Sequence, residues 1–185
     1  MERRGAARLL LAAAFALAGA ACSRSAAQEG GPRLVVEWSG SDTGRMVAPV
    51  HVEWCDTLRL LEIRGVRGDS GVAVAVYPGG PVRADSYPVR PPARADSAPP
   101  ASAIAIRWFA ETAIKGFTGD RGVVVLERAD DRVTGYFEAG MRSVTDGMRL
   151  ELRGTFRDVP VVPMRLGCVP RGAPPPDEPI DSGVD

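Results

Sequence analysis

The sequence is poor in several residue types that carry chemistry. Its 185 residues include one histidine, three cysteines, a single lysine at position 115 and no asparagine. Long apolar runs are also lacking, because the longest one covers only residues 9–21. A helix that spans a bilayer needs about 20 apolar residues. The sequence therefore predicts no permanent transmembrane helix.

The common motifs of catalysis and metal binding are missing as well. There is no P-loop, no HExxH motif, no nucleophile elbow and no CxxC pair. The 23 basic residues balance the 23 acidic ones, and they are scattered, whereas nucleic-acid binding requires a concentrated basic face. We therefore expect no catalytic residue, no metal, no cofactor and no nucleic-acid partner, and we predict that the protein is not an enzyme.

What the sequence does contain is a pattern typical of an export signal over residues 1–21. Arg3, Arg4 and Arg8 precede the apolar run, and small residues follow it. A positive start, a short apolar stretch and a small-residue exit define a secretory signal peptide. Removing these residues takes away three arginines and one glutamate, so the net charge changes from zero to −2.

The cysteine directly after the small residues, Cys22, resembles the lipobox of bacterial lipoproteins. The resemblance covers residues 1–23 and implies that Cys22 is lipidated and becomes the new N-terminus. Two or more acyl chains anchor a protein stably, since each buried methylene contributes about 0.8 kcal/mol. Ser23 then favours sorting to the outer membrane, facing the periplasm or the surface. Gly19 stands where the lipobox commonly has leucine, so a secreted soluble protein is the alternative.

The rest of the chain is predicted to form one domain between two polar segments. Residues 22–32 are small and polar, as in a flexible tether. Residues 33–168 are expected to form the domain, interrupted by a proline-rich loop at 78–102. Residues 169–185 are rich in proline and acidic side chains, which predicts a disordered tail. In composition the mature domain resembles uncharacterised exported proteins only.

Alternating and β-branched segments predict an all-β fold. Val50, Val52 and Trp54 alternate with polar neighbours, which is the period of a strand. An Asp-Gly dipeptide at 146–147 between two alternating runs indicates a hairpin. Many short strands with frequent turns favour an antiparallel sandwich of jelly-roll or immunoglobulin-like kind. A lipocalin-like barrel is the alternative.

Cys55 and Cys168 form an even pair once Cys22 is assigned to lipid. In an oxidising compartment such a pair is most simply a disulfide, although two buried thiols remain an alternative. His51 and Glu53 share a strand face with Cys55, which could suggest a metal site or a catalytic dyad. We favour the simpler interpretation, a half-buried strand with His51 and Glu53 toward solvent, because strand alternation alone produces the pattern.

These observations together predict a lipid-anchored protein of the cell envelope. Its non-catalytic β-sandwich domain would serve a structural or binding role, with an envelope protein or a glycan as partner. The alternative is a carbohydrate or small-ligand binding protein, whether secreted or anchored. Exposed aromatic rows would favour sugars, and an apolar barrel pocket would favour a small ligand.

Overall fold

The computed structural model describes residues 30–110, 113–164 and 168. The chain divides into two units, Met1–Gly31 and Pro32–Asp185, and the account below concerns the second. The predicted signal peptide, the lipidation site Cys22 and the predicted tail at 169–185 lie outside the described residues.

The described part consists of nine strands and one short helix. In chain order they are β1 (Arg33–Gly40), β2 (Gly44–Cys55), β3 (Leu60–Arg67), β4 (Ser70–Tyr77), β5 (Asp85–Pro88), α1 (Pro92–Ala95), β6 (Ala101–Ala110), β7 (Ala113–Ala129), β8 (Arg132–Ser143) and β9 (Arg149–Pro163).

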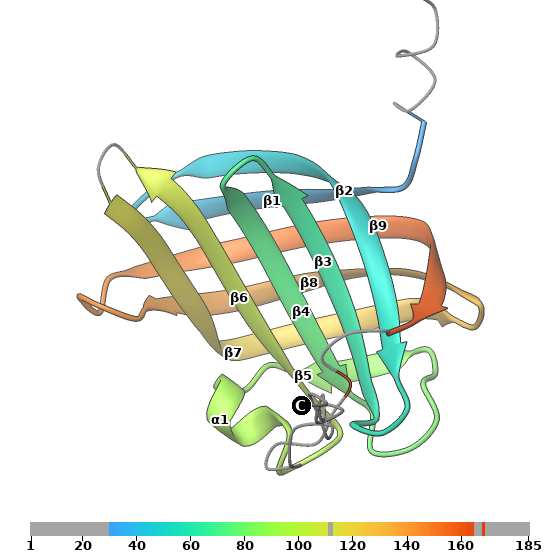
Figure 1. Cartoon of the computed structure of the whole chain (residues 1–185). Helices are drawn as coiled ribbons and strands as arrows, with labels where there is room; N and C mark the ends of the chain where they lie inside the picture. Colours follow the sequence, from blue (N-terminus) through green and yellow to red (C-terminus); the bar gives the residue numbers. More distant parts are fainter. Residues whose placement is uncertain (1–29, 111–112, 165–167, 169–185) are drawn as a thin grey trace, which may run out of the picture. The chain divides into compact units, whose positions relative to one another are not determined.

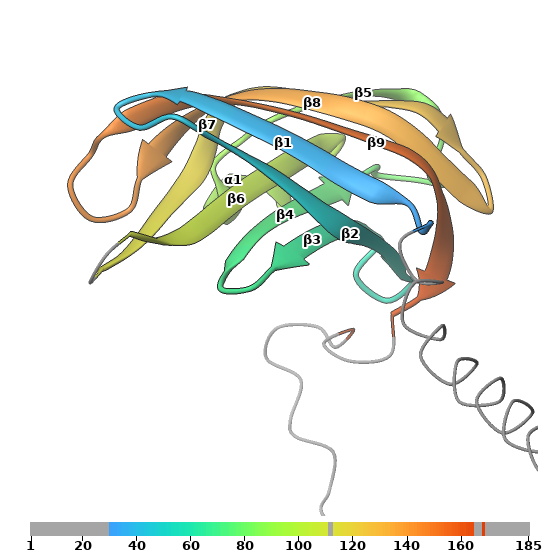
Figure 2. The ribbon, with the colours of Figure 1, turned by 90° about the horizontal axis from the view of Figure 1, so that it is seen from above.

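Eight of the strands form a closed antiparallel barrel. Each pairs with its neighbour along the chain, in the order β1, β2, β3, β4, β6, β7, β8 and β9. The last strand, β9, pairs antiparallel with β1 and closes the ring. Figures 1 and 2 show the result, with β3, β4 and β6 on one side and β8, β9 and β1 on the other.

The predicted all-β class is therefore confirmed, but the architecture is the barrel alternative rather than the preferred sandwich. Inward and outward side chains alternate along the strands of both architectures, so alternation cannot distinguish them. The difference lies in two seams. β7 pairs with β8 from Phe117 to Ala129, and β9 pairs with β1 from Leu34 to Gly40. Because of these pairings, the strands form one continuous ring and are not divided into two separate sheets.

Near its end β9 passes from one neighbour to another. β1 begins at Arg33, opposite Pro49 of β2, so β2 extends beyond the start of β1. Val161 at the end of β9 then pairs with Val52 of β2 in parallel. β9 thus takes the place that β1 leaves open, and it ends beside the end of β2.

Residues 85–90 fill a gap where β6 and β7 diverge. β5 pairs with β7, while the amide of Arg90 donates to the carbonyl of Ser102 in β6 at 2.8 Å. The buried hydroxyl of Ser102 donates to the carbonyl of Tyr87 at 3.0 Å. The proline-rich segment predicted to be a loop therefore contains a short strand, and Pro88 is tolerated because β5 is an edge.

Large side chains from all eight barrel strands fill the interior. The fully buried ones include Leu34, Ile63, Phe117, Phe137 and Phe156.

Candidate functional site

The structure brings the predicted cysteine pair together. Cys55 ends β2 and is fully buried. The Cα atoms of Cys55 and Cys168 lie 5.4 Å apart, and their sulfurs are at bonding distance. That Cα separation is in the usual range for a cystine. The bridge fixes the chain beyond β9 to the end of β2.

The histidine constellation has the geometry of an ordinary strand. Val50 and Val52 are buried, whereas His51 is exposed on the outer face. Glu53 forms an ion pair with Arg64 of the neighbouring strand. In the described residues no three side chains of the metal-ligating types lie close enough together to hold a metal ion.

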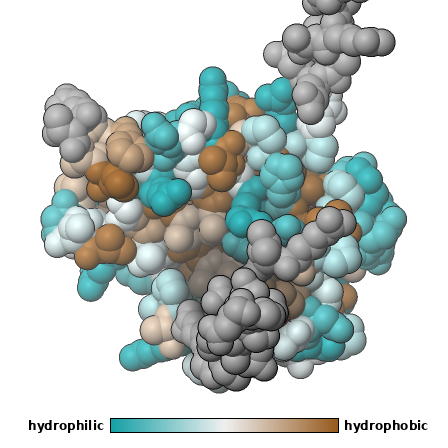
Figure 3. Space-filling model, in the orientation of Figure 1, coloured by the Kyte–Doolittle hydropathy of each residue, from teal (hydrophilic) through white to brown (hydrophobic). Residues whose placement is uncertain are grey.

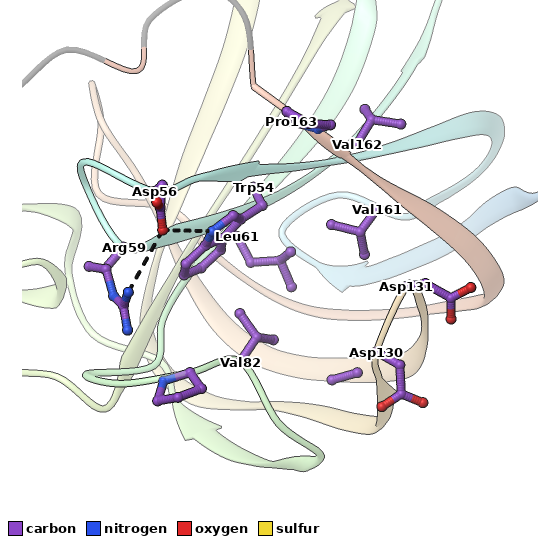
Figure 4. A pocket seen from close by; sticks show the side chains of 12 residues that line it. Trp54, Asp56, Arg59, Leu61, Val82, Asp130, Asp131, Val161, Val162 and Pro163 are labelled. Carbon is purple, nitrogen blue, oxygen red and sulfur yellow. Dashed lines mark hydrogen bonds and ion pairs between the residues drawn. The ribbon is translucent and has the colours of Figure 1, made fainter.

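A pocket of about 560 Å³ opens at the end of the barrel where β2 and β9 end. Figure 4 shows it from close by. Four separate parts of the barrel contribute to it: the β2–β3 turn with its flanking residues, the segment after β4, the β7–β8 turn and the end of β9. Its lining consists of Trp54, Asp56, Arg59, Leu61, Pro81, Val82, Ala129, Asp130, Asp131, Val161, Val162 and Pro163. We call it the mouth pocket.

The floor of the mouth pocket is apolar and continuous with the barrel core. Leu61 is fully buried, and Trp54, Val82 and Val161 pack against the core while remaining partly exposed. Strand alternation places Trp54 here, since it follows Val50 and Val52 on the inward face of β2. The pocket can therefore remove the apolar body of a small molecule from water.

One wall of the pocket combines an aromatic ring, a carboxylate and a guanidinium. The indole nitrogen of Trp54 donates to Asp56 Oδ1 at 3.3 Å. Arg59 Nη1 lies 3.7 Å from the same oxygen, and the Arg59 guanidinium lies 5.7 Å from the centre of the Trp54 ring. Figure 4 shows both contacts converging on Asp56. The wall thus already holds a cation against an aromatic face.

The opposite wall is acidic, and its carboxylates form ion pairs with an arginine that lies outside the pocket. Arg128 Nε lies 3.3 Å from Asp130, and Arg128 Nη2 lies 3.4 Å from Asp131. The same guanidinium reaches Asp158, whose pKa is lowered chiefly by a hydrogen bond from Arg132 and further by the nearby charges. The Asp130 and Asp131 carboxylates are solvent-exposed, so they contribute a negative rim rather than a buried site.

Two further hollows are less suited to hold a ligand. One of about 670 Å³ lies beside β1 and β9, where the charged residues Arg45 and Glu37 pair with each other at 3.1 Å. Another of about 440 Å³ runs over the outer face of β4 and β6, where Ala73 and Ala105 form a shallow floor. On this face apolar and hydrophilic side chains are interspersed (Figure 3).

Sequence reasoning found only part of the mouth pocket. Trp54 is among the aromatic residues that a ligand face could use, but its neighbours in space come from distant turns. The pair Asp130 and Asp131 has the composition of an ordinary turn, and nothing local marks Arg59. No sequence signal connects these positions, because only barrel closure brings the β7–β8 turn beside the β2–β3 turn.

Comparisons with protein-family models, with curated proteins and with solved structures find no match to this chain. Within the part of the chain that the structure describes, no helix has the length and apolarity to cross a bilayer.

Proposed function

We propose that the protein is an exported, non-catalytic binding protein whose barrel takes up a small, mostly apolar molecule in the mouth pocket. Lipid on Cys22 would hold the protein at a membrane of the cell envelope, and residues 23–32 would space the barrel from that surface. The chain thus serves the alternative function of small-ligand binding rather than a purely structural role.

The observation that carries this proposal is the apolar floor of the mouth pocket. Ligand pockets are typically concave, about 300–1,000 Å³ in volume and mostly apolar, with a few polar groups that orient the ligand. The mouth pocket has about 560 Å³ and combines Trp54, Leu61, Val82 and Val161 with a polar rim. Mouths of β-barrels are also frequent places for such sites.

The proposal is tested with the neutral apolar dye N-phenyl-1-naphthylamine, whose fluorescence rises in an apolar environment. The purified protein should bind it saturably. Val82 lines the pocket from a loop, so Val82→Glu should weaken binding at least tenfold by placing a charge among apolar groups. Val144→Glu is the matched control, because Val144 is 64% exposed and does not line the mouth pocket.

Saturable binding that Val82→Glu weakens and Val144→Glu leaves unchanged supports the mouth pocket as the site. Two results would contradict it: no saturable binding to the wild-type protein, or an equal loss in both variants. Urea unfolding of each variant verifies that the barrel remains folded.

A further inference from the structure

Arg59 is held in an unusual conformation at the rim of the mouth pocket. Its φ angle is +50°, in the left-handed region that residues other than glycine rarely adopt. It lies in the turn between β2 and β3, where a glycine would meet the same backbone requirement without a steric cost. An arginine at this position therefore accepts a steric cost in its backbone conformation, and its side chain supplies a guanidinium at the pocket.

That guanidinium lies between two groups that attract cations, the Trp54 ring and the Asp56 carboxylate. The Trp54 ring offers its electron-rich face at 5.7 Å, and Asp56 offers a carboxylate oxygen at 3.7 Å. An aromatic face beside a carboxylate is the usual recognition chemistry for ammonium and guanidinium groups. The hydrogen bond from the Trp54 indole to Asp56 at 3.3 Å holds the two parts of this subsite together.

The charges around the pocket favour a cation over an anion. The described lining residues include three carboxylates, those of Asp56, Asp130 and Asp131, and only one cation, Arg59. Arg128 already binds both Asp130 and Asp131 and does not belong to the lining. Asp56 depends on Arg59 for its charged partner. Moving Arg59 aside would therefore leave an acidic pocket around an apolar floor.

We propose that Trp54 and Asp56 form a cation subsite of the mouth pocket and that Arg59 is its internal occupant, which a ligand displaces. The inference rests on the proposed binding function and names the ligand class: a molecule with an apolar body and one ammonium or guanidinium group. The body lies on Leu61, Val82 and the rest of the floor, and the cation takes the place of the Arg59 guanidinium.

Displacement is physically reasonable because Arg59 is weakly held. Its side chain is 51% exposed and that of Asp56 is 85% exposed, so solvent screens their ion pair. A ligand that also buries an apolar body on the floor of the pocket gains a further favourable contribution to its binding.

Three probes of equal chain length separate the cation subsite from the apolar floor: octylammonium, octanol and octanoate, each measured by displacement of N-phenyl-1-naphthylamine. Wild-type protein should bind octylammonium about two- to fivefold more tightly than octanol, as a partly exposed cation–π contact allows. Octanoate should bind more weakly than octanol because of the acidic rim.

Two variants assign the preference to the subsite. Arg59→Gly removes the occupant and suits the positive φ, so octylammonium should bind several-fold more tightly than to wild-type protein. Asp56→Asn should abolish the preference for octylammonium over octanol. Arg67→Gly is the matched control for the change in net charge, since Arg67 lies in the β3–β4 hairpin outside the pocket, and it should behave as wild type.

The outcomes distinguish the two proposals. Octanol binding with an unchanged ratio of octylammonium to octanol in Arg59→Gly and Asp56→Asn overturns the cation subsite and leaves the binding function intact. Absence of saturable dye binding to the wild-type protein overturns both, and failure of octylammonium to displace a dye that does bind overturns the subsite alone. An equal gain in Arg59→Gly and Arg67→Gly assigns the effect to overall charge and also overturns the subsite.

Discussion

At the scale of single residues, the interior of the barrel depends on glycines that face aromatic and aliphatic side chains. Gly154 of β9 lies opposite Phe137 of β8, and a Cβ atom at Gly154 would stand only 2.1 Å from the Phe137 ring. Gly65 of β3 faces Leu34 in the same way, at 2.6 Å. Large side chains thus lie over positions on neighbouring or next-neighbouring strands that carry no side chain.

Gly154→Ala is therefore expected to destabilise the fold by about 1–3 kcal/mol, the usual cost of overpacking a core. Urea unfolding measures the loss. Gly116→Ala is the matched control, because the nearest atom to a Cβ there is Val144 Cγ2 at an ordinary 3.6 Å, and it should change stability by less than about 0.5 kcal/mol. A mild Gly154→Ala variant would mean that Phe137 repacks freely.

The ion pair between Asp42 and Lys115 predicts a specific pH dependence. Lys115 Nζ lies 3.1 Å from Asp42 Oδ2, and this hydrogen bond, helped by the backbone amide of Thr43, lowers the pKa of Asp42 from 3.8. The folded chain thus favours the charged carboxylate more than the unfolded chain does. The pair stabilises the fold above about pH 4, and this contribution is lost as the pH falls through the lowered pKa.

Asp42→Asn should accordingly be less stable than wild-type protein at pH 7, by less than about 1 kcal/mol, because the pair is partly exposed and solvent screens it. The two proteins should converge as the pH falls toward 3. Urea midpoints measured at several pH values give the comparison. A difference that stays constant from pH 7 to pH 3 would show that the ion pair is not its source.

At the scale of elements, β9 connects otherwise distant parts of the barrel. It pairs with β8 along most of its length, with β1 on its other side, and with β2 at its end. The cystine between Cys55 and Cys168 then ties the chain after β9 to the end of β2, across 113 residues of sequence.

Removing this bridge should lower the free energy of unfolding substantially. In the chain-entropy model a loop of this length contributes on the order of 4–5 kcal/mol. Urea unfolding of wild-type protein with and without reductant, and of the double variant Cys55→Ser and Cys168→Ser, measures the effect. The reductant should not alter the double variant, and an unaffected wild-type protein would refute the stabilising role.

Elements were predictable from sequence where the signal was local. The Asp146-Gly147 hairpin is present, with Gly147 at a φ of +73° and Asp146 accepting a hydrogen bond from the amide of Met148. The choice between barrel and sandwich was not predictable, because it depends on β9 meeting β1, two segments more than a hundred residues apart. The mouth pocket was missed for the same reason, since Arg59 and Asp130 come to line one pocket only in the closed barrel.

At the scale of the whole molecule, the two ends of the barrel differ in how they are filled. Near one end Trp38 stacks on Trp108 at 5.0 Å between ring centres, and Trp108 stacks on Phe117 at 5.2 Å. The other end holds the mouth pocket and the cystine. The stacked aromatic rings occupy the first end, which supports the mouth pocket as the place where the proposed ligand would enter.

The proposed tether makes a prediction for the protein in a bacterial host that exports it. Mass spectrometry should find an N-terminus at Cys22 bearing acyl chains, and the protein should fractionate with membranes. Cys22→Ser should move it to the soluble fraction, because a single polar side chain cannot replace the buried methylenes. An N-terminus at Ala21 or Gln28 would instead indicate plain secretion.

The order of the strands also has a consequence for how the barrel assembles. Apart from the short parallel contact of β9 with β2, every seam of the barrel except one joins strands that are close in sequence, so those hairpins can form locally and early. The exception is the seam between β1 and β9, which must wait for nearly the whole chain. A protein exported unfolded would thus circularise its sheet only after its last strand has crossed the membrane. Until then β1 presents an unpaired edge. The chain is therefore most prone to aggregate before the ring closes.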